Sequence, residues 1–227
     1  MLGVYNYTVW LTYLSLLSSV TGIIVALDGT GHPFYGTLCL LLCGLFDAFD
    51  GKVARTKKER THLEIGFGIQ IDSLSDLVAF GVLPGCIGVS ILMVHNVNAG
   101  LDPNVIGMSH GWIYYIIVLA LALAALVRLA YFNVTEEQRQ KEEGGVRKYY
   151  EGLPVTASSL VFPIVICVAY MLDCDPIDSY FPAMLLTALA FVSRIRIPKP
   201  GLRGILIMVG VGALALAYMA INGIFIR

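Results

Sequence analysis

Long apolar segments separated by short polar ones run through almost the whole sequence. About twenty apolar residues are needed to cross the hydrocarbon core of a bilayer, and seven segments reach or approach that length. They cover residues 9–27, 34–54, 69–94, 111–132, 154–172, 179–193 and 204–225. The sixth is short, so the pattern predicts an all-α, polytopic integral membrane bundle of six to seven transmembrane helices. No linker or repeat divides the chain, so one domain is expected over residues 1–227.

Composition supports a membrane protein over a soluble one. The chain is 57% apolar and 14% charged, and its mean hydropathy is +0.77. A net charge of -1 lacks the basic excess of a nucleic-acid-binding protein. The five cysteines form no CxxC pair, so they are interpreted as small packing residues and not as zinc or redox ligands.

Basic residues are segregated along the chain. Fourteen of the fifteen lysines and arginines follow the second, fourth and sixth apolar segments, while residues 28–33, 95–110 and 173–178 contain none. Loops rich in Lys and Arg stay in the cytoplasm. The sequence therefore predicts a multi-pass protein of the cell (cytoplasmic) membrane with a cytoplasmic N-terminus.

Four aspartates lie at the predicted cytoplasmic ends of the second and third segments. Asp47 and Asp50 are spaced i,i+3, and Asp72 and Asp76 are spaced i,i+4, so each pair occupies one helical face. Carboxylates at a membrane boundary are costly without a partner, and hard oxygen ligands suit Mg²⁺ or Mn²⁺. A divalent-metal site at the cytoplasmic side is expected.

Two glycines and an arginine flank these carboxylates. Gly51 and Gly68 carry no side chain, which lets a phosphate approach the backbone. Arg55 lies one turn from Gly51 and is placed to meet that anion.

The same residues carry a family resemblance. Asp47-x2-Asp50-Gly51-x2-Ala54-Arg55, followed by Gly68-x3-Asp72-x3-Asp76, resembles the signature of the CDP-alcohol phosphatidyltransferases, integral membrane enzymes of phospholipid synthesis. Four stretches, taken in order, are similar to the phosphatidylserine synthases of that superfamily: "FGIQIDSLSDLVAFGVLP", "VRLAYFNV", "YYEGLPVTASS" and "FVSRIRIPKP". The resemblance is strongest over about residues 12–200.

The chain departs from the family pattern in two places. Twelve residues separate Arg55 from Gly68, more than is usual, and this leaves the partners of Glu64 open. Thr12-x2-Ser15-x2-Ser18 resembles the polar stripe of the family's first helix, but the Pro-Asn that usually precedes it is missing and only Asn6 lies nearby.

The resemblance implies a reaction in which L-serine attacks CDP-diacylglycerol directly, giving phosphatidylserine and CMP in the lipid membrane. It implies two divalent cations held by the four aspartates, with Asp76 also the general base for the serine hydroxyl. The CDP moiety would be lined by Gly51, Ala54, Arg55 and Gly68.

Further residues are expected to hold the acceptor. The planar guanidinium of Arg128 suits a carboxylate or a lipid phosphate, although a basic residue at a helix end can also be a snorkelling anchor. Asn133 is expected to orient the serine amine. Gly81-x3-Gly85 fits a close helix contact, a dimer face or a kink at Pro84, and a homodimer is expected.

Two other functions compete. A sister enzyme of the same superfamily would use glycerol 3-phosphate or inositol phosphate, and additional basic residues would be expected near its site. A divalent-metal transporter would use the acidic cluster at mid-depth, whereas these aspartates lie near one face and no paired broken helices are evident.

Overall fold

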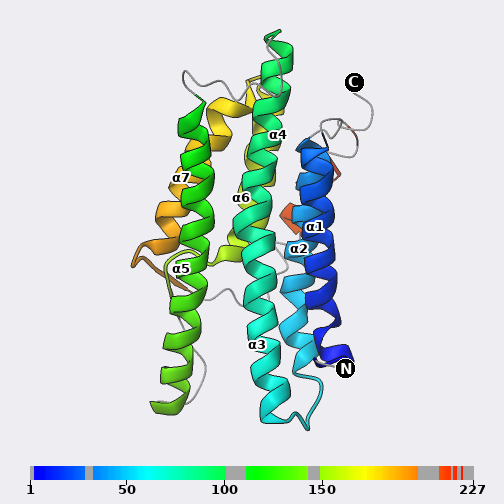
Figure 1. The fold of residues 1–227 in the computed structure, drawn as a ribbon, viewed down its shortest axis with the longest axis vertical. Coiled ribbons are helices and arrows are strands. Elements are labelled where there is room, and N and C mark those ends of the chain that lie inside the picture. The colour runs from blue at the N-terminus through cyan, green and yellow to red at the C-terminus, as the bar shows by residue number, and fades with distance from the viewer. Residues whose placement is uncertain are drawn as a thin grey trace.

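The protein is a bundle of long helices (Figure 1), seen in a computed structural model that describes residues 3–28, 33–100, 111–142, 149–198, 210–215, 217–218 and 221. Three described helical stretches are long and apolar enough to cross a membrane: Tyr7–Leu27, His62–Asn98 and Trp112–Arg139. Val155–Met171 and Pro176–Val192 are shorter apolar helices. The predicted all-α membrane bundle is confirmed, while most of the predicted span 204–225 lies outside the described residues.

The first two helices run antiparallel, side by side. A short 3-10 helix, η1 (Tyr7–Val9), leads into α1 (Trp10–Leu27), and α2 (Pro33–Ala54) returns along it. The end of the bundle where α1 begins and α2 ends is called the basic end, because the loop after α2 carries a cluster of Lys and Arg: Arg55, Lys57, Lys58 and Arg60.

A continuous rod stands at the centre of the bundle (Figure 1). It consists of α3 (His62–Asp76), the π-helical segment η2 (Leu77–Val82) and α4 (Leu83–Asn98). In η2 the Leu83 N–H donates to the Val78 carbonyl, five residues earlier. Pro84 cannot donate a backbone hydrogen bond and crowds the preceding turn, and the segment before it is π-helical; a kink at Pro84 was one of the alternatives that the sequence left open. Turns of π-helix are frequent at functional sites, and this one begins directly after Asp76.

The remaining helices pack around this rod. They are α5 (Trp112–Glu142), the 3-10 helix η3 (Val155–Ala157), α6 (Ser158–Met171) and α7 (Pro176–Val192). The core between α4, α6 and α7 is aromatic, and the buried Tyr180 hydroxyl donates to the Pro84 carbonyl oxygen at 2.8 Å. Helix α5 runs ten residues beyond the predicted span because its polar end is rich in helix-forming Glu, Gln and Arg.

Gly81 and Gly85 form a helix contact within the chain. A Cβ atom at Gly81 would lie 2.9 Å from Ala125 Cβ, and one at Gly85 would lie 2.7 Å from Val118 Cγ1, both on α5. Small residues permit this close approach of α5 to the rod. The predicted homodimer would therefore need another surface.

Two short strands that the sequence pattern did not predict join distant motif segments. The strand β1 (Tyr149–Glu151) pairs antiparallel with β2 (Arg196–Pro198). Gly152 follows with φ of +77°, and its N–H donates to the Ile195 carbonyl at 2.8 Å. This conformation is one that glycine adopts without strain. The next N–H, of Leu153, donates to the Ala190 carbonyl at 3.0 Å. This bond holds residues 151–154, called the "EGLP" turn, against the end of α7.

Candidate active site

Three carboxylates converge between α2 and α3. One oxygen from each of Asp47, Asp50 and Asp72 lies within 4.8 Å of the others, and all three side chains are half-buried. At that separation two ionised carboxylates repel each other by roughly 3 kcal/mol at an effective dielectric constant of about 20. We call these residues the acidic triad.

The donor set of the acidic triad fits a hard divalent cation. Oxygens on opposite sides of a Mg²⁺ ion are about 4.2 Å apart, since each Mg–O bond is about 2.1 Å. The triad oxygens lie within 4.8 Å of one another. The chemistry and the separation of Asp47, Asp50 and Asp72 are therefore compatible with a shared ion.

Asp76 lies in a different environment from the acidic triad. It is one turn beyond Asp72 on α3, is only 8% exposed, and does not belong to the group within 4.8 Å. The sequence interpretation gave Asp76 two roles, metal ligand and general base. Its deeper burial is what distinguishes Asp76 from the three aspartates of the triad.

Helix α1 contributes to the site through the first residue of its polar stripe. Thr12 is buried, and its hydroxyl donates to Asp50 Oδ2 at 3.4 Å. The Ser75 hydroxyl in turn donates to the Thr12 carbonyl oxygen at 3.3 Å. The stripe therefore contacts the acid site directly, and α1 is bonded to both α2 and α3.

The predicted nucleotide-binding residues lie next to the acidic triad. The Arg55 guanidinium lies over Gly51, where a Cβ atom would be 3.6 Å from Nη2. A Cβ atom at Gly68, one turn before Asp72, would meet no described atom within 4 Å. Ala54 is half-buried at the last residue of α2. The backbone at Gly68 is therefore open to a ligand.

Arg128 is a buried cation and not a snorkelling anchor. It is only 6% exposed, and its Nε donates to the Leu153 carbonyl oxygen at 3.2 Å. Its Cζ lies 5.4 Å from the centroid of the Phe132 ring, within cation–π range. A snorkelling side chain would keep its charged head in water. The "EGLP" turn thus helps to fix the guanidinium.

Asn133 is bonded to the helix that carries Asp72. Its Nδ2 donates to the Ser73 hydroxyl oxygen at 2.7 Å, which ties α5 to α3. Ser73 immediately follows Asp72, so this contact holds Asn133 against the turn of α3 that carries Asp72. Sequence reasoning proposed Asn133 as an acceptor ligand without this partner.

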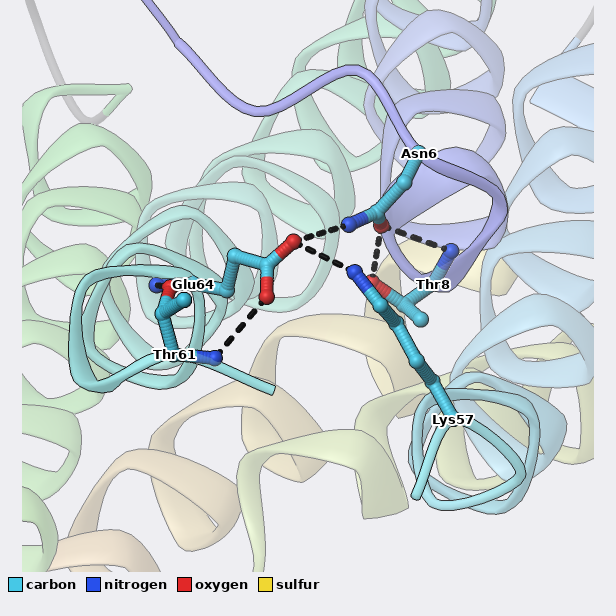
Figure 2. Close-up of polar contacts among 5 residues, drawn as sticks. All are labelled: Asn6, Thr8, Lys57, Thr61 and Glu64. Atoms are coloured by element: carbon cyan, nitrogen blue, oxygen red, sulfur yellow. Dashed lines mark hydrogen bonds and ion pairs between the residues drawn. The ribbon is translucent and has the colours of Figure 1, made fainter. Parts of the chain in front are cut away.

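The sequence interpretation missed a cluster around Glu64 (Figure 2). Glu64 Oε1 accepts from Asn6 Nδ2 at 2.8 Å and pairs with Lys57 Nζ at 2.5 Å, and Oε2 accepts from the Thr61 N–H at 2.9 Å. Thr61 and Glu64 form a capping box, which the Thr-x-x-Glu spacing signals. The contact with Asn6 spans 58 residues and has no such local signal.

Comparison with known proteins identifies the family of the chain. The model of the CDP-alcohol phosphatidyltransferase family matches residues 5–195, so the chain belongs to that family.

Three curated relatives have names that describe enzymes of phosphatidylserine or archaetidylserine synthesis. A CDP-diacylglycerol–serine O-phosphatidyltransferase of Saccharomyces cerevisiae is 35% identical over 61% of this chain and 45% of its own length. An archaetidylserine synthase of Methanothermobacter thermautotrophicus is 31% identical over 65% of this chain and 53% of its own. A Methanocaldococcus jannaschii enzyme with the same name as the yeast protein is 27% identical over 82% and 72%. The chain spans about half the length of the first two relatives.

Proposed function

We propose that this protein transfers the phosphatidyl group of CDP-diacylglycerol to L-serine, releasing CMP. The observation that carries the proposal is the convergence of Asp47, Asp50 and Asp72 beside the open backbone of Gly68, in the order of the family signature. The names of the relatives favour serine as the acceptor.

The residues divide into roles by their surroundings. Asp47, Asp50 and Asp72 hold the divalent ions, Mg²⁺ or Mn²⁺, which when bound neutralise the charge of the donor's pyrophosphate. Thr12 orients Asp50 through its hydrogen bond. The buried Asp76 accepts the proton of the attacking serine hydroxyl.

Helices α2, α3 and α5 supply the substrate contacts. The open space at Gly68 admits the nucleotide, with Gly51, Ala54 and Arg55 along the neighbouring wall. Arg128, fixed by Leu153 and Phe132, binds the serine carboxylate or the lipid phosphate, because a guanidinium matches both in a planar fork. Asn133, held beside Asp72 by Ser73, orients the serine amine.

L-serine should support CMP release from CDP-diacylglycerol far better than glycerol 3-phosphate or myo-inositol 1-phosphate. The reason is that a phosphorylated acceptor requires cations beyond Arg128 near the site. The assay is CMP release by the detergent-purified protein with each acceptor, and the blank omits the acceptor. A higher rate with glycerol 3-phosphate would make the serine assignment wrong.

The basic end should face the cytoplasm, as the segregation of Lys and Arg predicts. A cysteine introduced by Lys58→Cys, at an exposed position, should react with a membrane-impermeant maleimide only after the cytoplasmic side is opened. Cys174 is an internal control, because it is exposed in the turn between α6 and α7 and should react in intact cells. The reverse pattern would invert the topology.

A further inference from the structure

We propose that Glu64 is a positioning residue for the divalent-ion site. Its side chain bonds to the segments that lead to Thr12 and Asp50, and its own helix carries Asp72. Glu64 thereby keeps the three carboxylates of the acidic triad in their relative positions. This inference rests on the ion site of the proposed function and adds to it a residue outside the metal ligands.

The bonds of Glu64 reach three separate elements (Figure 2). Asn6, which donates to Oε1, also accepts from the Thr8 N–H at 3.1 Å and so caps η1, the lead into α1. Lys57 stands just beyond the last turn of α2, which the Thr56 N–H extends by donating to the Val53 carbonyl. Glu64 itself lies in the first turn of α3. We call Asn6, Lys57 and Glu64 the clasp.

Each element held by the clasp leads to the acidic triad. From Asn6 the chain passes through η1 into α1, where Thr12 donates to Asp50. Along α3, Glu64, Gly68 and Asp72 are spaced four residues apart and share one face. Eight residues of helix place the Glu64 backbone about 12 Å from that of Asp72.

The clasp complements a second contact on the other side of Asp72. The hydrogen bond from Ser75 to the Thr12 carbonyl joins α1 and α3 three residues beyond Asp72. One such contact would let the two helices pivot about it. With Asn6 bonded to Glu64 as well, α1 and α3 are pinned on both sides of the triad.

The triad requires this restraint because its members repel one another. Asp50 and Asp72 belong to different helices, α2 and α3, which are joined by residues 55–61. This connection keeps the two helix ends near each other but does not by itself set the angle between the helices. The ion pair between Lys57 and Glu64 shortens the free segment to the residues between them. Helix capping alone needs neither Lys57 nor Asn6, so their presence points to a role beyond the cap.

The test is Mn²⁺ binding to the detergent-purified full chain, without lipid or serine, measured from the electron paramagnetic resonance of free Mn²⁺. Glu64→Gln should weaken Mn²⁺ affinity by about tenfold, the low end of what loss of a ligand-orienting group costs. Lys57→Met should cause a smaller loss in the same direction. Thr61→Ala is the matched control, because it removes the cap hydroxyl of the same helix and leaves the bonds of Glu64 to Asn6 and Lys57.

The Thr61→Ala variant distinguishes a role of Glu64 in positioning the ion site from a role in the stability of α3. Thr61→Ala should lower Tm yet bind Mn²⁺ as the unsubstituted protein does. Unchanged Mn²⁺ affinity in Glu64→Gln, or an equal loss in Thr61→Ala, would overturn the inference. If Glu64→Gln does not fold, Lys57→Met decides by the same comparison, since Lys57 is partly exposed. If Asp72→Asn also leaves Mn²⁺ affinity unchanged, the proposed ion site is wrong, and the role of Glu64 falls with it.

Discussion

Asp72→Asn should abolish tight divalent-ion binding and lower turnover by at least about a thousandfold. Asn keeps the size of the side chain but removes one anionic ligand from the acidic triad. An ion that polarises a phosphoryl oxygen contributes several kcal/mol to the transition state, and each 1.36 kcal/mol is about tenfold in rate. Mn²⁺ titration and CMP release measure the two losses, and a high Mn²⁺ concentration should restore part of the rate.

A second acidic residue provides the control for Asp72→Asn. Asp178 is exposed in the first turn of α7, far along the chain from the triad. Asp178→Asn makes the same chemical change and should leave both Mn²⁺ affinity and turnover as they were. Near-normal Mn²⁺ affinity in Asp72→Asn would remove Asp72 from the ligand set.

The acidic site was predictable because it depends on helical periodicity. The spacings within Asp47-x2-Asp50 and Asp72-x3-Asp76 fix which residues share a face once the apolar pattern has assigned the helices. The short loop between the two helices then brings the faces together. The same pattern predicted the apolar helices whose described residues form the bundle.

Contacts between distant segments were not predictable in this way. The bond of Asn6 to Glu64 depends on how far η1 extends beyond α1, which no local pattern encodes. Arg128 occupies a helix position typical of a snorkelling anchor, yet it is buried, and its Nε donates to the "EGLP" turn at the Leu153 carbonyl. The position of that turn depends on the pairing of β1 with β2, two strands too short to leave a sequence pattern.

The structure around Pro84 could be predicted only in part from the sequence. The missing N–H of this proline predicts a disturbed helix at a known place, but whether the helix bends, breaks or widens depends on its neighbours. Here Tyr180 donates to the Pro84 carbonyl and α5 packs against Gly81 and Gly85, so the rod stays continuous as a π-helical turn.

Asp76→Asn should affect turnover without releasing the ions. If Asp76 takes the serine proton, its loss should cut kcat by about 10²–10⁴-fold, the usual contribution of a general base. Mn²⁺ affinity should change little, because Asp76 lies outside the triad oxygens within 4.8 Å of one another. The measurements are kcat for CMP release and the Mn²⁺ titration, with Asp72→Asn as the comparison that loses both.

The outcome also distinguishes the two roles that the sequence assigned to Asp76. A loss of Mn²⁺ affinity as large as in Asp72→Asn would make Asp76 a ligand, and a near-normal kcat would exclude it as the base. Direct attack by serine further implies that labelled CMP does not exchange into CDP-diacylglycerol when serine and phosphatidylserine are both omitted. The two serines of the signature are bonded elsewhere among the described residues: Ser73 accepts from Asn133, and Ser75 donates to the Thr12 carbonyl oxygen and not to an aspartate. Rapid exchange would instead require a covalent phosphatidyl-enzyme formed with release of CMP, and a base would then have to activate the enzyme's own nucleophile before serine attacks the intermediate.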